Sequence, residues 1–132
     1  MVTENNLSFE QTDIAERLAA IDDAALDALQ FGVIGFDDQT VVQRYNAFES
    51  RLAGLDKSRV VGNPLFTSVA PCMNNFLVAQ RFEDALATGE PLDATIDYVL
   101  TLRMKPVKVK LRLLAWSGSA LRYVLILRPH LS

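Results

Sequence analysis

The last third of the chain constrains the fold most, because its apolar and polar residues alternate. Over residues 107–113 every second side chain is Val or Leu, and the side chains between them are Lys or Arg. This period of two is typical of a β-strand with one buried face. A Lys-Pro pair and a Ser-Gly-Ser run separate this segment from two others that are rich in strand-forming residues. The predicted strands are residues 93–104, 107–116 and 121–128.

A second group of strand-forming residues begins at Phe31. Residues 31–36 contain two glycines, which let another segment approach closely. The polar residues 37–39 favour a turn, and residues 40–45 read as a returning strand, so the pair predicts a hairpin. Together with the three C-terminal strands, the hairpin predicts a five-stranded antiparallel sheet.

Two short helices are predicted before the sheet. Apolar residues recur at helical spacing over residues 9–20, and Ser8 with Gln11 fits a capping box at the start of this helix. Residues 24–29 follow two aspartates that can cap a second helix. We expect these helices to form a small cap on the main body.

Further helices are predicted between the two groups of strands. Asn46 can cap a helix over residues 47–52, and another short helical segment lies within residues 55–61. A longer helix is expected over residues 75–87, with Gly89 as its stop.

The order of these elements predicts the α+β class. Strands and helices are grouped along the chain, which favours an antiparallel sheet with short helices on one face and leaves room for a pocket between them. With 132 residues, of which 50% are hydrophobic, the chain fits one domain. We predict an N-terminal helical cap of residues 1–28 and a core of residues 29–132.

The cysteine and histidine content excludes several kinds of chemistry. One cysteine cannot form an internal disulfide framework or a cysteine-rich zinc site. The only histidine, His130, lies near the C-terminal end, where chains fray. A nucleophilic cysteine would therefore lack a histidine base. We expect neither an enzyme nor a metal protein.

The charge pattern argues against nucleic-acid and membrane partners. The formal net charge is −3, and no basic block stands out. The first residues lack a basic region followed by an apolar run, and no apolar run approaches membrane-spanning length. The expected location is the cytoplasm.

Cys72 lies between a constrained extended segment and the predicted longer helix. Pro71 fixes its own φ and biases Ala70 away from helical geometry. A helix starting near Asn75 would place the thiol close to its N-terminus, where the helix dipole favours a thiolate. This position suits a reactive cysteine, but an inert buried cysteine is the simpler interpretation from the residues alone.

Tyr45 and Glu49 are one helical turn apart, so both can face the same way. A phenol and a carboxyl could then meet one ligand oxygen. From the spacing alone, a tyrosine and a surface glutamate that never meet are the simpler interpretation. Phe66 and Met104 likewise read most simply as core residues.

Taken together, four motifs in this sequence resemble the photoactive yellow protein family. The resemblance runs from about residue 21 to residue 128, and the spacing of the hairpin, the Tyr-Glu pair and the cysteine needs no gaps. The motifs are Leu26-Asp27-x-Leu29-x-Phe31-Gly32, Tyr45-Asn46-Ala47-x-Glu49, Val69-Ala70-Pro71-Cys72 and Arg103-Met104-Lys105-Pro106-Val107-Lys108-Val109.

This resemblance implies a PAS fold and a blue-light photoreceptor. Cys72 would carry p-coumaric acid (4-hydroxycinnamic acid) as a covalent thioester, with the Cys72 N–H on its carbonyl. Tyr45 and Glu49 would hydrogen-bond its phenolate oxygen, and Met104 would assist its return from cis to trans. Other residues implied at the site are Pro71, Ala53, Leu55 and Phe66.

The resemblance also implies how a signal would arise. Light would isomerise the chromophore from trans to cis, Glu49 would pass its proton to the phenolate, and the N-terminal cap would loosen. An uncompensated buried charge on Glu49 costs about 3–5 kcal/mol, enough to release a weakly held element. The expected partner is a downstream signalling protein that the sequence does not identify, and the chain would act as a monomer or homodimer.

Two residues depart from the best-known members of that family. Ala53 stands where they have a Thr that supports the tyrosine, and Leu55 where they have an Arg that covers the pocket. A lost neutral hydrogen bond is worth about 0.5–1.5 kcal/mol, so we expect a more easily protonated chromophore than in those members. The alternative is a chromophore-free PAS sensor or interaction module, whose pocket binds another small molecule or whose Cys72 senses redox state.

Overall fold

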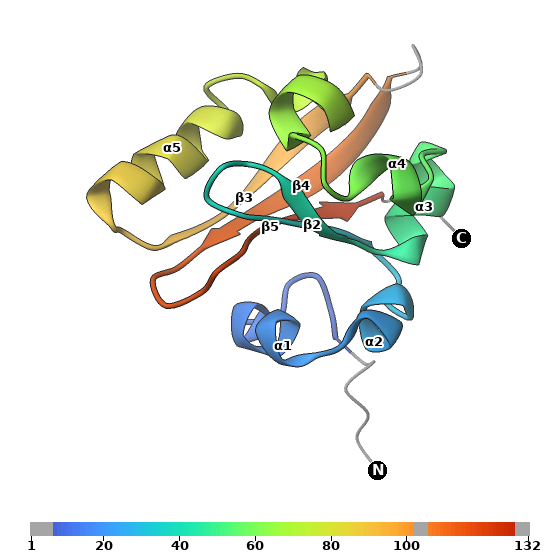
Figure 1. Ribbon diagram of the computed structural model, residues 1–132, viewed down its shortest axis with the longest axis horizontal. Coiled ribbons are helices and arrows are strands. Elements are labelled where there is room, and N and C mark those ends of the chain that lie inside the picture. The colour runs from blue at the N-terminus through green and yellow to red at the C-terminus, as the bar shows by residue number, and fades with distance from the viewer. Residues whose placement is uncertain (1–6, 102–105, 129–132) are drawn as a thin grey trace.

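The computed structural model describes residues 7–101 and 106–128 and contains a five-stranded sheet (Figure 1). The strand order is β2-β1-β5-β4-β3, and every neighbouring pair is antiparallel. The strands are β1 (Gly32–Phe36), β2 (Val42–Tyr45), β3 (Leu92–Leu100), β4 (Val107–Ala115) and β5 (Arg122–Leu127). The predicted α+β class, the hairpin and the antiparallel sheet are therefore confirmed.

Two short helices precede the first strand and three more lie between β2 and β3, as the sequence predicts. They are α1 (Ile14–Ala20), α2 (Asp23–Asp27), α3 (Ala47–Ala53), α4 (Lys57–Val60) and α5 (Ala79–Thr88). Between α4 and α5 lie a π-helical turn (Leu65–Val69) and a 3₁₀ turn (Pro71–Met73). No helix among the described residues is long and apolar enough to cross a membrane.

The two faces of the sheet carry separate apolar layers. On the face that we call the helical face, Ile34 and Ile126 pack with residues of α4, α5 and the two turns. On the opposite face, the cap face, Val33 and Leu125 pack against α1 and α2. Figure 1 shows α1 and α2 on one side of the sheet and α4 and α5 on the other. The two predicted N-terminal helices therefore cover the central strands β1, β5 and part of β4 on this face.

The first helix starts later than the sequence predicts. Ser8 N–H donates to Gln11 Oε1 at 3.1 Å, so half of the predicted capping box forms, but α1 begins only at Ile14. The reason is a distant contact: the Arg112 guanidinium of β4 donates to the carbonyls of Phe9 and Gln11 at 2.9 and 2.8 Å. The Gln11 carbonyl also accepts from the Ile14 N–H at 3.3 Å, so Arg112 ties the segment just before α1 to the sheet.

A second arginine, Arg44 of β2, holds the end of α1. Its guanidinium donates to the carbonyls of Leu18 and Ile21, both at 2.8 Å, and to Tyr123 Oη at 3.0 Å. The last carbonyls of a helix have no partner within the helix, and a cation there also suits the helix dipole. Arg44 therefore closes α1 and ties it to the sheet.

Candidate functional site

Cys72 lies in the 3₁₀ turn on the helical face. Its side chain is half-buried, carries a free thiol and packs against the apolar layer of that face, while Pro71, which opens the turn, is exposed. The Cys72 carbonyl accepts hydrogen bonds from Tyr98 Oη at 2.6 Å and from Asn75 Nδ2 at 3.2 Å. The turn that carries the thiol is thus fixed to β3 through its backbone.

The predicted start of the longer helix at Asn75 is wrong. Asn75 Oδ1 accepts from the N–H groups of Leu77 and Val78 at 3.0 and 3.2 Å, and α5 begins only at Ala79. Asparagine side chains favour such turns over helix because they supply the backbone with an alternative partner. Cys72 therefore lies in a turn of its own and not at the N-terminus of a long helix.

Tyr45, the last residue of β2, is buried on the helical face opposite Ile34. Burial and the charge of Glu49 raise the pKa of the Tyr45 hydroxyl, and the charge of Arg128 partly offsets this. Among the described residues, no group forms a hydrogen bond with Tyr45 Oη. Because its pKa is raised, the phenol keeps its proton.

Glu49 is buried in the first turn of α3, where only 1% of the residue is exposed. Asn46 caps this helix, since its Oδ1 accepts from the Glu49 N–H at 3.1 Å. The predicted proximity of Tyr45 and Glu49 agrees with the electrostatic effect of Glu49 on Tyr45. Their predicted contact with one ligand oxygen stays a prediction.

The residue that the sequence analysis missed is Arg128. Its guanidinium forms an ion pair with Glu49, with the shortest contact at 2.6 Å. No local motif joins the two residues, which lie in different thirds of the chain. The one available signal is the alternation of β5, which puts Arg128 in phase with Val124 and Ile126 of the helical face.

The remaining predicted site residues lie in different environments. Ala53 is buried in α3, and Leu55 is partly buried against the helical-face layer. Phe66 is buried in the π-helical turn, where its ring meets that of Phe36 edge-on at 5.6 Å. Met104 lies outside the described residues.

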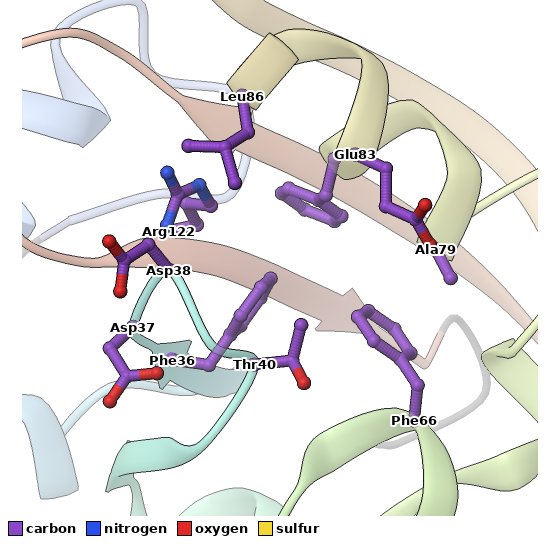
Figure 2. Close-up of a pocket in the computed structure, with 10 residues that line it drawn as sticks. Phe36, Asp37, Asp38, Thr40, Phe66, Ala79, Glu83, Leu86 and Arg122 are labelled. Carbon is purple, nitrogen blue, oxygen red and sulfur yellow. The ribbon is translucent and has the colours of Figure 1, made fainter.

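A small cleft opens beside Phe66. Figure 2 shows the rings of Phe36 and Phe66 at this cleft, with Asp37 and Asp38 of the β1–β2 turn on the same side as Arg122 of β5. Its volume is about 60 Å³, whereas ligand pockets usually measure about 300–1,000 Å³. Of the predicted site residues it contains only Phe66, so this cleft is not the predicted ligand site.

Comparison with known proteins identifies the class of this fold. A family model described as "PAS fold" matches residues 26–129. The structure resembles the photoactive yellow protein domain of the sensor histidine kinase Ppr from Rhodospirillum centenum. The TM-score is 0.74 at 38% sequence identity, and the match covers 80% of this chain and 92% of that chain. The chain is a PAS-fold protein.

Two curated relatives narrow the assignment. The photoactive yellow protein of Rhodothalassium salexigens is 36% identical over 107 residues, which cover 81% of this chain and 85% of the relative. The photoactive yellow protein of Halochromatium salexigens is 37% identical over 109 residues, which cover 83% and 86%. The chain belongs to the photoactive yellow protein family.

Proposed function

We propose that this protein is a blue-light photoreceptor that carries p-coumaric acid as a thioester on Cys72, and that it is not an enzyme. The observation that carries this proposal is the free, half-buried thiol of the single cysteine, in a chain of the photoactive yellow protein family. A thioester needs a thiol, and Cys72 is the only side chain that has one.

Two donor groups on the helical face fit this ligand. A buried phenolate is costly unless strong donors hold it. Tyr45 Oη and the Cys72 N–H both lack a hydrogen-bond partner among the described residues. The first group would serve the phenolate oxygen, and the second the thioester carbonyl.

When bound, the chromophore would supply absorption of blue light and isomerisation about its double bond. The protein would hold and move protons around it. Tyr45 would keep its O–H on the phenolate oxygen. Glu49 would hold a proton at a carboxyl oxygen, donate it in a hydrogen bond, and release it after light absorption. The assistance expected of Met104 belongs to the same proposal.

The N-terminal cap is the proposed output element. Its backbone carbonyls bind Arg44 and Arg112 of the sheet, and water can replace such partners when the cap moves away. Local elements held in this way can open without global unfolding. The proposed receiver is a downstream signalling protein in the cytoplasm, with the receptor acting as a monomer or homodimer.

Reconstitution tests the proposed function directly. The purified apoprotein is mixed with p-coumaric anhydride, and intact mass and visible absorbance are measured. We expect one p-coumaroyl group per chain and a new visible band that bleaches under blue light. Cys72→Ala should abolish both, and Met73→Ala serves as a neighbouring control for attachment. A native protein without adduct, or an adduct that survives Cys72→Ala, would contradict the proposal.

One observation favours a second candidate function. Glu49 is already paired with Arg128, and an ionised carboxylate has no proton to donate to a phenolate. A PAS sensor that binds a different small molecule, or that responds through the redox state of Cys72, would need no such proton. In that case the reconstituted protein would show no adduct or no light response.

A further inference from the structure

The carboxylate of Glu49 is held by both nitrogens of one guanidinium. Arg128 Nη1 donates to Glu49 Oε1 at 2.6 Å, and Nη2 donates to Oε2 at 3.0 Å. The exposed fraction is 2% for the Glu49 side chain and 8% for the Arg128 side chain. Both oxygens accept, which is the geometry of an ionised carboxylate.

Three elements create this pair. Asn46 fixes the first turn of α3 and so directs Glu49 toward the sheet. Gly32 of β1 leaves the space for the carboxylate, because a Cβ at this position would collide with Glu49 Oε1. Arg128 follows β5 directly and reaches the same place from the other side of β1.

Few charged groups act on Glu49. The pKa of Glu49 lies above its ordinary value because burial has the largest effect, and the only opposing influence among the described residues is the guanidinium of Arg128. Tyr45 of β2 lies close enough for Glu49 to act on it, and its hydroxyl stays neutral because burial raises the hydroxyl pKa. Arg128 is therefore the group that favours the carboxylate over the protonated acid.

We propose that Arg128 is a positioning residue that sets the protonation state of Glu49. While paired, it holds Glu49 as a carboxylate, so Glu49 must take up a proton from solvent before it can donate a hydrogen bond to a ligand phenolate. This inference rests on the proposed function for its ligand, but its first step concerns the protein alone.

Arg128 also provides a partner for Glu49 after the proton leaves. Glu49 gives the proton of its carboxyl oxygen to the ligand oxygen, keeps the electron pair of the broken O–H bond, and becomes the carboxylate that Arg128 binds. The charge on Glu49 is then compensated, in contrast to the unpaired charge that the sequence analysis expects. Arg128 would thereby prolong the state in which Glu49 is ionised.

Titration of the apoprotein tests the first step. The glutamate side chains are labelled with ¹³C, the Glu49 Cδ resonance is assigned through the bonded network of its own residue, and its shift is followed from about pH 4 to pH 9. We expect a carboxylate at pH 7 in the wild type. Arg128→Gln should raise the titration midpoint of Glu49 by at least about one pH unit, because a neighbouring opposite charge shifts a carboxyl by about 1–3 units.

Two further variants separate charge from packing. Arg128→Lys keeps the charge and should restore part of the shift, whereas Arg122→Gln, at the other end of β5, should leave the Glu49 midpoint in place. A midpoint unmoved by Arg128→Gln would overturn the proposal. If that variant does not fold, the wild-type measurement decides, since a protonated Glu49 at pH 7 would also overturn it.

The loaded protein tests the second step. After reconstitution, the lifetime of the light-induced absorbance change should shorten several-fold in Arg128→Gln, because Glu49 without its cation recovers a proton faster. An unchanged lifetime would overturn the role of Arg128 after proton release. Absence of the p-coumaroyl adduct on the wild type would contradict the proposed function but would leave the apoprotein titration valid.

Discussion

Asn46 is fully buried, and its side-chain amide makes four hydrogen bonds. Nδ2 donates to the carbonyls of Leu26 and Phe31 at 3.1 and 2.9 Å. Oδ1 accepts from the N–H groups of Val33 and Glu49 at 3.0 and 3.1 Å. One side chain therefore joins α2, β1 and α3, and it also directs Glu49 toward Arg128.

Asn46→Ala should lower the free energy of unfolding by about 2–4 kcal/mol. It removes a helix cap, worth about 1 kcal/mol, and leaves buried backbone groups without partners at about 1–3 kcal/mol. Urea denaturation measures this change. Asn63→Ala is the matched control, because Asn63 is exposed and makes one side-chain hydrogen bond, to the Arg59 carbonyl. Equal losses in the two variants would contradict the role given to Asn46.

At the scale of elements, α1 depends on β2 through Arg44. Arg44→Gln should speed amide exchange in α1 at least about tenfold, because hydrogen bonds to a charged group are worth about 1.5–3 kcal/mol and 1.36 kcal/mol is a factor of ten. Exchange in α5 should not change. Hydrogen exchange followed by mass spectrometry gives the measurement. Arg17→Gln, which breaks only an exposed pair with Asp13, serves as the control. Equal amide exchange of α1 in the two variants would contradict the role given to Arg44.

Element types follow from local patterns in this chain, but several boundaries do not. The alternation of β4, the capping Asn46 and the stops at Gly54 and Gly89 can all be read along the sequence. The start of α1 cannot, because Arg112, about a hundred residues away, binds its carbonyls. The sequence also does not predict the ion pair of Glu49 with Arg128, because only the folded sheet brings these two residues together.

At the scale of the whole molecule, Arg112 of β4 binds the N-terminal segment through the Phe9 and Gln11 carbonyls, and Asp93 of β3 holds Arg112 in place. The hydrogen bonds and charge of Arg112 lower the pKa of Asp93 below its ordinary value of 3.8. A carboxyl with a lowered pKa in the folded state stabilises the fold above the unfolded value and loses this contribution as pH falls through the folded value. Acid should therefore weaken the contact between the cap and β4.

Asp93→Asn should make unfolding less dependent on pH between about pH 6 and pH 3. The Asp93 side chain is 55% exposed, so the difference should lie within the roughly 0.2–1 kcal/mol of exposed pairs. Urea denaturation of wild type and variant at both pH values gives the comparison. An identical pH dependence in the two proteins would show that Asp93 does not contribute.

The two faces of the molecule meet in β2. Tyr45 faces the helical face, and the preceding Arg44 reaches α1 on the cap face. Successive residues of a strand point to opposite faces, so any rotation of β2 moves both side chains. The predicted division into a cap of residues 1–28 and a core of residues 29–132 stays a prediction. It would place Arg44 in the core and its partner, the Leu18 carbonyl, in the cap.

Gly32 offers a way to sort related chains by their amino-acid sequences alone. Every residue type other than glycine brings a Cβ into the place of the Glu49 carboxylate. A homologue with any other residue here would have to shift the glutamate side chain, so glycine at this position together with arginine at the position of Arg128 marks chains that can form the pair in the same geometry. These two alignment positions thus separate homologues that can form this ion pair from those in which the glutamate must have other neighbours.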